Sequence, residues 1–502
     1  MSAPVVIVGA GPTGITAATL LAQRGIDCVI LDRWSDVYPQ PRAVHLDDEV
    51  HRIIAKLGIA DQFREISRST IGLRLLDRTQ RVLAEFRRDK ATGVNGYAQA
   101  TLFDQPDLEH LLRDNLTRHR AARLLGDVEV TDVEPVDGGV RVGYTDRSDG
   151  TEHVLQAAYV LGCDGANSLV RERMGVTMQD LKFDQRWLVV DIATTAELGR
   201  WNGVHQVCDP RRAATYMRIG PTRHRWEFQL LPDETGSDFP DLDALWPLIA
   251  PWLGDVGTDA LTVVRTAEYT FRAQLADRWR CGRVFLLGDA AHLTPPFIGQ
   301  GMGAGIRDAM NLSWKLAAVL TGQLPDSVLD SYEQERKPHA RSMIRLALLA
   351  GRVMTGGGWA GSAVRGWALP WLRRFPGLGA ALLDGSTPRL RHSALVTGGR
   401  LAGALCPNSI VTEDKRFDDV VGNGFVLVTR SAVDVAMPGV HIHRATPGDE
   451  LDRWLRRGRA HVALVRPDGA VMSSGATLPP LPAAPGSPAH RPTRCHRRPN
   501  VP

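Results

Sequence analysis

Short, continuous apolar runs open the chain and recur near residue 284. Val5–Val8 and Cys28–Leu31 are four-residue runs of mostly β-branched or aliphatic residues, typical of parallel strands buried on both faces. Between them, apolar residues follow helical spacing as far as Gly25, a residue suited to ending a helix. Val284–Leu287 is another such run, followed by a Gly-rich loop and a long helical pattern. This order predicts an α/β fold with a Rossmann-like domain.

Between these two parts, alternating strands replace the continuous apolar runs. Residues 128–142 alternate around Asp137-Gly138-Gly139, which predicts an antiparallel hairpin. Further short strands are expected at Leu188–Ile192, Val204–Cys208 and Trp226–Leu230. We therefore predict an antiparallel sheet, inserted into the Rossmann-like domain, that binds the substrate.

The same pattern divides the chain into five segments. Residues 1–180 and 276–390 are expected to form the two parts of the Rossmann-like domain, the second with a helical extension. Residues 181–275 are expected to form the inserted sheet, and residues 391–472 a small C-terminal domain. Residues 473–502 are rich in Pro, Ala and Arg without periodicity, which predicts a disordered tail.

Composition excludes several classes of protein. The 502 residues are 43% hydrophobic and 23% charged with a net charge of +4, so a nucleic-acid partner is not indicated. Six cysteines without a CxxC pair fit neither a disulfide framework nor a metal site. No apolar stretch approaches the roughly 20 residues that span a bilayer, and no signal peptide precedes Val5. We expect a cytoplasmic protein that binds neither membrane nor metal.

The first chemical motif follows the first strand. Gly9 permits a tight turn, Gly11 lets the backbone approach a pyrophosphate, and Gly14 allows close packing of helix on strand. Asp32, about twenty residues on, is placed to accept hydrogen bonds from a ribose. Because strand, turn, helix and acid come in this order, the motif predicts an adenine dinucleotide, NAD or FAD.

Two later stretches distinguish between these dinucleotides. One is Asp164-Gly165, which follows an apolar strand. The other is Gly288-Asp289, where a carboxylate stands at the end of a buried strand, the edge at which open α/β sheets bind ligands. A Gly-rich run around Gly299 and Gly301 then opens a helix whose amides could face the pyrimidine edge of a flavin.

These three motifs, in this order and spacing, resemble the single-component FAD-dependent aromatic-ring hydroxylases, the family of para-hydroxybenzoate hydroxylase. The resemblance covers residues 5–351. It implies that Asp289 binds the ribityl chain of FAD and that Asp164 lies near the pyrophosphate and the path of NADH or NADPH. It also implies contacts to the cofactor from Arg42 and Gln105. The remaining residues expected at the cofactor are Arg33, Gly299, Gln300, Gly301 and Met302.

Within this family, local stretches are most similar to the hydroxylases of 3-(3-hydroxyphenyl)propionate. They include residues 39–44, Val189–Ile192 and Trp226-Glu227-Phe228. Gly398–Leu401 and Val465–Gly469 resemble the thioredoxin-like C-terminal domain of those enzymes. That domain has no CxxC here, so the likeness is expected to be structural only.

The resemblance implies a monooxygenase reaction. NADH or NADPH, bound transiently, reduces FAD, and one oxygen atom of O2 enters a small phenolic ring ortho to its hydroxyl. The expected reaction converts 3-(3-hydroxyphenyl)propionate to 3-(2,3-dihydroxyphenyl)propionate. His45 is the candidate for helping to remove the phenol proton. A cation for the propionate would come from Arg186, Arg218 or Arg265, each of which is also typical of a solvated surface.

Two alternatives share the same motifs. The substrate could be a larger polycyclic or antibiotic-type aromatic compound, or the chain could bind FAD without turnover. The sequence also leaves open whether the chain forms a homodimer.

Overall fold

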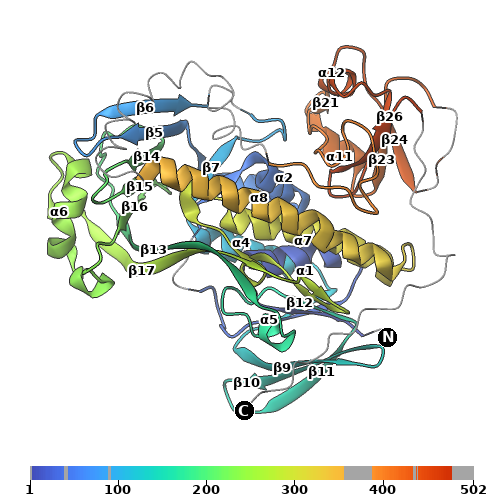
Figure 1. Cartoon of the computed structure of the whole chain (residues 1–502), viewed down its shortest axis with the longest axis horizontal. Helices are drawn as coiled ribbons and strands as arrows, with labels where there is room; N and C mark the ends of the chain where they lie inside the picture. Colours follow the sequence, from blue (N-terminus) through green and yellow to red (C-terminus); the bar gives the residue numbers. More distant parts are fainter. Residues whose placement is uncertain are drawn as a thin grey trace.

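The computed structural model describes residues 3–38, 43–88, 92–355, 387–433, 437 and 439–477. At its centre lies a six-stranded sheet, in which β1 is flanked by β2 and β12; Figure 1 shows β12 of this sheet below α1. Its order is β18 (Arg280–Cys281), β19 (Val284–Leu286), β12 (Tyr159–Gly162), β1 (Val5–Val8), β2 (Cys28–Leu31) and β8 (Ala122–Leu125). All neighbours pair in parallel except β18 and β19. The predicted α/β character of this part is confirmed.

Long helices cover this sheet. Helix α1 (Pro12–Ala22) begins directly after β1 and packs against α7 (Gly301–Leu320), although nearly 300 residues separate them. Both helices bury most of their side chains, and α8 (Asp330–Thr355) packs against α7. The other helices here are α2 (Asp48–Lys56), α3 (Ala60–Glu65), α4 (Gln105–Leu116) and α5 (Leu169–Arg173).

Two small antiparallel sheets flank the central one. The predicted hairpin around Gly138 is confirmed as β9 (Val128–Val136) and β10 (Gly139–Asp146), to which β11 (Glu152–Ala157) adds a third strand. The second sheet has the order β3 (His45–Asp47), β7 (Ala100–Phe103) and β4 (Ser67–Ser69).

An eight-stranded sheet forms the second large layer. Its order is β20 (His292–Leu293), β17 (Thr262–Ala276), β13 (Met178–Ala193), β16 (Arg223–Gln229), β15 (Ala214–Arg218), β14 (Val204–Val207), β5 (Gly72–Leu76) and β6 (Val82–Arg87). The three predicted short strands lie within β13, β14 and β16. However, β5, β6 and β20 come from outside residues 181–275, and β5 pairs with β14 in parallel. The sheet is therefore neither purely antiparallel nor made by the insertion alone.

Alternation within the eight-stranded sheet gives it two different faces. Leu188, Val190, Trp226 and Phe228 point to one face, where α6 (Leu242–Leu253) covers them and forms a core. Residues one position along each strand, such as Val189 and Glu227, point to the opposite face, toward the Rossmann-like domain. Because side chains alternate with period two, this second face is free to line a site.

The C-terminal unit is a four-stranded mixed sheet. Its order is β24 (Val440–Arg444), β23 (Phe425–Thr429), β25 (Val462–Val465) and β26 (Val471–Gly475), with α11 (Phe417–Val421) and α12 (Glu450–Arg457) beside it. Strand β26 continues through Ser473, which pairs with Leu464, so the tail was predicted to begin too early. The end of β26 is set by its pairing with β25, which the composition of the segment does not reveal. Residues 478–502 lie outside the described residues, and the thioredoxin-like assignment stays a prediction.

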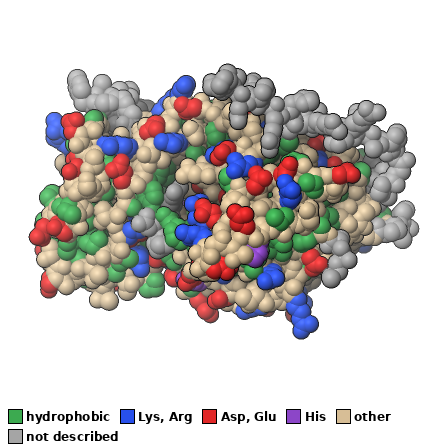
Figure 2. All heavy atoms as spheres, turned by 90° about the horizontal axis from the view of Figure 1, so that it is seen from below, with side chains coloured by type: hydrophobic (Ala, Val, Ile, Leu, Met, Phe, Trp, Pro, Cys, Tyr) green, Lys and Arg blue, Asp and Glu red, His purple; other side chains and the backbone are tan. Residues whose placement is uncertain are grey.

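The remaining elements are short: β21 (Ile410–Thr412), β22 (Lys415–Arg416) and the 3-10 turns η1 (Gly236–Asp238), η2 (Thr258–Ala260), η3 (Gly288–Ala290), η4 (Pro296–Ile298) and η5 (Asp326–Leu329). On the face in Figure 2, acidic and basic side chains are interspersed. Within the described part of the chain, no helix is long and apolar enough to cross a membrane.

Candidate active site

A cavity of about 1090 Å³ lies between the two large sheets. One end is lined by the turn after β1 and by Asp32, and the other by Trp187, Val189 and Tyr269 of the eight-stranded sheet. Pockets for drug-sized ligands usually measure about 300–1,000 Å³, so this cavity can hold more than one small molecule. It runs without interruption from the dinucleotide motif to the sheet predicted to bind the substrate.

The glycines of the first motif differ in what surrounds them. Gly9 has φ +102°, and a Cβ there would lie 2.4 Å from the carbonyl oxygen of Cys163. A Cβ on Gly14 would lie 2.0 Å from the carbonyl oxygen of Gly9, so helix and turn pack as the motif requires. A Cβ on Gly11, by contrast, would meet no atom of the described protein within 4 Å. The space beside Gly11 is therefore not filled by the described protein. A glycine at such a position lets a ligand approach the backbone closely.

Two helices begin at the wall of the cavity. Neither α1 nor α7 has a side-chain cap or an acidic residue in its first turn. Gly11 and Pro12 of the first helix, and Gly301 and Met302 of the second, line the cavity. The free N–H groups in the first turn of each helix, apart from Pro12, which has none, and the positive ends of the helix dipoles therefore favour negative charge there. This arrangement suits a pyrophosphate at α1 and an electron-rich ring edge at α7.

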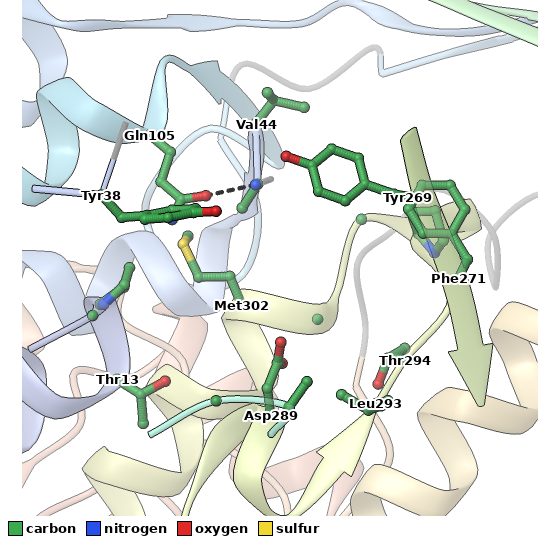
Figure 3. Close-up of a pocket in the computed structure, with 18 of the residues that line it drawn as sticks. Thr13, Tyr38, Val44, Gln105, Tyr269, Phe271, Asp289, Leu293, Thr294 and Met302 are labelled. Carbon is green, nitrogen blue, oxygen red and sulfur yellow. Dashed lines mark hydrogen bonds between the residues drawn. The ribbon is translucent and has the colours of Figure 1, made fainter. Parts of the chain in front are cut away.

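Asp32 and Gln105 lie on the cavity wall and are held by backbone amides. Asp32 accepts hydrogen bonds from Ala10 N at 2.5 Å and Trp34 N at 2.8 Å. Gln105 Oε1 accepts one from Ala43 N at 2.6 Å (Figure 3). Arg33 also lines the cavity, whereas Arg42 lies outside the described residues.

Asp164 and Asp289, the acidic residues of the two later motifs, make different interactions. Asp164 accepts hydrogen bonds from Ser168 Oγ at 2.6 Å and Val170 N at 3.0 Å, so its carboxylate holds the start of α5. Burial raises the pKa of Asp164. Asp289 instead points into the cavity (Figure 3). The structure therefore favours Asp289 for contacting a ligand directly and Asp164 for shaping the loop.

Buried polar residues hold these loops in place, and sequence reasoning did not assign them. Arg171 donates to Ala166 O at 2.8 Å and Ala290 O at 3.0 Å, which joins the loops of Asp164 and Asp289. Asp308, fully buried, accepts from Gly288 N at 3.1 Å and pairs with His292 at 2.8 Å. His292 is thus a hydrogen-bond partner of the loop. The feature of the sequence that could have identified Asp308 is its position on the buried face of a predicted helix.

Gln300 does not face the cavity. Its Oε1 accepts a hydrogen bond from Arg307 at 2.9 Å, and the residue is buried away from the lining. Arg307 also forms an ion pair with Glu49 at 2.8 Å and one with Asp47. The buried Arg307 guanidinium thus holds the Gln300 side chain away from the cavity, so a contact of Gln300 with the cofactor would come from its backbone and stays a prediction. Gly299, Gly301 and Met302 do line the cavity.

His45 lines the cavity beside the start of α7. Its Nδ1 lies 3.3 Å from the carbonyl oxygen of Gly299, and a Cβ on Gly299 would lie 2.8 Å from the same ring. Burial, and secondly the Arg88 charge, lower the pKa of His45 to about 4. A neutral imidazole with this pKa suits a donor that holds the Gly299 loop better than a general base. Its catalytic role stays a prediction.

The pH dependence of catalysis tests His45. In His45→Gln, where the amide can still donate to Gly299, we expect the kcat/KM profile between pH 6 and 8 to keep its shape. The reason is that a histidine with pKa about 4 is already neutral throughout this range. Loss of a limb with a pKa between 6 and 8 would instead show that His45 accepts the proton. Steady-state rates at constant ionic strength measure this.

The sheet wall of the cavity is mainly aromatic and apolar. Tyr269 points into the cavity (Figure 3), and its hydroxyl accepts a hydrogen bond from Arg265 at 3.3 Å. Arg265 is buried and pairs with Asp191 at 2.9 Å. The alternative that Arg265 is a solvated surface residue is therefore wrong. Tyr216 lies on the opposite face of the sheet, in the core with α6.

Arg186 and Arg218 do not serve as cavity cations. Arg186 donates to carbonyl groups at the end of the β16 loop, including Leu231 O at 3.2 Å. Arg218 pairs with Glu197 at 3.4 Å, where both side chains are accessible to solvent. The arginines that do line the cavity are Arg33, Arg88, Arg113 and Arg272.

Comparison with known proteins identifies the family of this chain. A family model described as an FAD binding domain matches residues 2–347. The chain belongs to this family. It is also 36% identical over 430 residues to a probable NADH-specific resorcinol 4-hydroxylase of Rhodococcus jostii, covering 84% of this chain and 78% of that one.

A further relative and two solved structures are also similar to this chain. A 3-(3-hydroxy-phenyl)propionate/3-hydroxycinnamic acid hydroxylase of Burkholderia cenocepacia is 34% identical over 435 residues, with the same coverage of both chains. The crystal structure of aklavinone-11 hydroxylase with FAD and aklavinone matches with a TM-score of 0.77 and 25% identity, covering 94% of this chain and 95% of that one. The rebeccamycin biosynthetic enzyme RebC with reduced flavin shares the fold, with a TM-score of 0.79 at 22% identity.

The chain is therefore an FAD-dependent aromatic hydroxylase with a mixed α/β fold of the FAD-binding monooxygenases. The clearance at Gly11, the two uncapped helix starts and Asp32 fit an FAD laid along the cavity. The individual contacts of these residues with FAD stay predictions.

Proposed function

We propose that this hydroxylase converts a small meta-substituted phenol into a catechol-type product by hydroxylating the carbon ortho to the phenol hydroxyl. The balanced reaction is phenol + NAD(P)H + H⁺ + O2 → hydroxylated phenol + NAD(P)⁺ + H2O. The observation that carries the proposal is the single cavity joining the dinucleotide turn to the aromatic wall of the eight-stranded sheet. Bound FAD would supply the redox chemistry and activate O2, while the chain orients the ring and excludes water.

The ortho position follows from the electronics of the ring. A phenol hydroxyl donates electron density to its ortho and para carbons, so orientation decides which of them reacts. Trp187, Phe271 and Phe297 supply flat apolar surface for a single ring on the sheet side. No described part of the chain repeats the dinucleotide turn, so we expect NAD(P)H to bind transiently. A cytoplasmic location remains part of this proposal.

Two specific substrates fit this class. The local sequence matches and the Burkholderia relative favour 3-(3-hydroxyphenyl)propionate, whose carboxylate would need a cation such as Arg88 at the wall beside His45. The Rhodococcus relative favours resorcinol, in which a second hydroxyl replaces the propionate.

Product analysis tests the proposal. Purified holoenzyme is incubated with NADH, ¹⁸O2 and, in turn, resorcinol, 3-(3-hydroxyphenyl)propionate and a polycyclic phenol. We expect a small phenol to accelerate NADH oxidation and to gain one labelled oxygen, with no label incorporated from H2¹⁸O. Hydroxylation of the polycyclic phenol alone would instead favour the larger substrate class. FAD-loaded protein that oxidises NADH at the same rate with and without every phenol would contradict an enzymatic role on phenols.

A further inference from the structure

Glu227 is an acidic side chain in the aromatic wall of the cavity. It lies on β16, where its neighbours Trp226 and Phe228 point to the opposite face and join the core under α6. Glu227 itself lines the cavity and is half-buried. Across the sheet it pairs with Val189 on β13 and Thr215 on β15. Its position is therefore set by strand register and not by a flexible loop.

The carboxyl of Glu227 has no partner among the residues that the structure describes, since none donates a hydrogen bond to it or forms an ion pair with it. The hydroxyl of Thr215, its neighbour across the sheet, donates instead to Gln206 Oε1 at 2.9 Å. Glu268 on the same sheet differs, because its carboxylate accepts a hydrogen bond from Gly236 N at 2.8 Å. The other acidic residues that line the cavity also have partners: Asp32, Glu109, Glu129, Asp164, Glu172 and Asp289.

A cluster of buried charges lies beside Glu227 on the same face of the sheet. Arg225, two residues before Glu227 on β16, makes two hydrogen bonds to Asp191 at 2.7 and 2.8 Å. Arg265 on β17 pairs with the same Asp191 at 2.9 Å. Because strand residues two apart share a face, these three residues, the Arg–Asp–Arg cluster, point to the side of Glu227. Two guanidinium groups against one carboxylate leave the cluster with a single positive charge.

An ionised Glu227 balances the charge of the Arg–Asp–Arg cluster. Arg223, two residues further along β16, forms an ion pair with Asp104 at 3.4 Å and so adds no net charge. Burial raises the pKa of Glu227; the two guanidinium groups of the cluster oppose this effect, and its carboxylate adds to it. A carboxylate that faces a cavity with a raised pKa and no internal donor is typical of a group that exchanges a proton with a ligand.

We propose that Glu227 is the catalytic base that accepts the proton of the substrate's phenol hydroxyl. This inference rests on the proposed function and adds its proton acceptor. The O–H bond of the phenol breaks, an O–H bond forms on the Glu227 carboxylate, and the electron pair stays on the phenolate oxygen. The negative charge thus moves from Glu227 to the substrate beside the positive cluster, and the summed charge of the site is unchanged. After oxygen transfer, Glu227 returns the proton to the product.

Glu227 suits this role better than His45. The imidazole of His45 has a pKa of about 4, so it is a weak base, and it is held by the Gly299 carbonyl. Raising the pKa of a carboxyl brings it closer to that of a phenol, about 10, and makes it a stronger base. Both candidate substrates carry the phenol hydroxyl. A role on this shared group agrees with the similarity of Trp226-Glu227-Phe228 to the hydroxylases of 3-(3-hydroxyphenyl)propionate.

Glu227→Gln keeps the shape of the side chain but cannot accept a proton. With resorcinol or 3-(3-hydroxyphenyl)propionate, whichever the wild type hydroxylates, we expect kcat/KM for product formation at pH 7 to fall about 100-fold or more. The rate of the variant should then rise with pH as the free phenol ionises by itself. The wild-type rate should instead fall on the acid side, where a carboxyl with a raised pKa becomes protonated.

A phenol that is already ionised separates a catalytic role from a structural one. A ring-fluorinated form of the same substrate, whose hydroxyl is ionised at pH 8, needs no base. Loaded Glu227→Gln should therefore hydroxylate it within about threefold of the wild-type rate. Equal losses on the ionised and the un-ionised phenol would show that Glu227 only supports the wall, and would overturn the inference.

Glu197→Gln is the matched control, because Glu197 is an exposed glutamate after β13, paired with Arg218, and it should behave as wild type. FAD content and thermal midpoint establish that each variant is folded and loaded. If the Gln variant loses FAD, Glu227→Asp decides: its withdrawn carboxylate should slow the un-ionised phenol at least about tenfold and spare the ionised one. Equal effects on both phenols would contradict the inference alone. A wild type that hydroxylates no phenol would contradict the proposed function as well.

Discussion

Replacement of Gly11 by valine is expected to abolish FAD binding while leaving the fold intact. A Cβ at this position meets no atom of the described protein within 4 Å, and the backbone angle φ is not left-handed, so we expect the apoprotein to keep its fold. The added methyl groups would occupy the space at the start of α1 where we place the pyrophosphate. We expect the affinity for FAD to fall more than about 100-fold, or roughly 2.7 kcal/mol.

The measurement is flavin content and FAD titration, with circular dichroism and the thermal midpoint of the apoprotein as checks on folding. Gly25→Ala is a matched control at the other end of α1, where a Cβ also meets no atom but φ is +72°. It should cost roughly 1–2 kcal/mol of stability and keep FAD. Asp289→Ala, on the facing wall, should weaken FAD binding independently. Full flavin occupancy in folded Gly11→Val would refute this placement of the cofactor.

The second large effect is expected at Glu335, which joins the C-terminal unit to the rest of the protein. Glu335 on α8 is fully buried, and it pairs with Lys315 of α7 at 2.9 Å and with Arg466 at 2.8 Å. It also accepts hydrogen bonds from Asn311 at 2.8 Å and Ser393 at 2.6 Å. These bonds hold the pKa of Glu335 well below its usual range, despite burial.

Glu335→Gln leaves a buried positive charge without compensation, so the free energy of unfolding should fall by about 3–5 kcal/mol. Urea unfolding of the variant and of the wild type measures the loss. Because the pKa of Glu335 is lowered in the folded state, its contribution is complete above the unfolded value of 4.5. The difference from wild type should therefore shrink as the pH falls below that value.

Glu134→Gln serves as the control for Glu335, since Glu134 forms an ion pair with Arg141 at the surface. Exposed pairs contribute about 0–1 kcal/mol, so this variant should stay close to wild type. A loss below 1 kcal/mol in Glu335→Gln as well would show that the buried cluster does not hold the C-terminal unit in place.

Local sequence order was sufficient to predict the central parallel sheet and the residues at the edge of the sheet that lines the cavity. The runs at β1, β2 and β19 are apolar throughout because both faces of a parallel sheet are buried, and this pattern is visible without a structure. The turn from Gly9 to Gly14 could be interpreted because its steric demands act within a few residues of the motif. Asp32 and Asp289 follow their strands directly, so their place at the sheet edge was predictable too.

The boundaries of the second layer were not predictable in the same way. Strands β5 and β6 end at Arg87, whereas the rest of their sheet begins only at Met178, and packing selects their parallel and antiparallel partners. Likewise, Ser473 belongs to β26 because of its pairing with β25, which its own composition does not signal. The direction of the Gln300 side chain could not be predicted either, because it depends on a hydrogen bond from the buried Arg307, about two turns further along α7.

The sequence by itself thus determined the cofactor class, the parallel sheet and the residues at the ends of its strands, because each depends on neighbours along the chain. Only the tertiary structure decided which side chains face the substrate end of the cavity. Glu227 stands between two aromatic residues in the sequence, and its alternation shows that it points away from them. That the opposite face borders a cavity, and that Thr215 and Arg225 are already occupied, depends on contacts between distant strands.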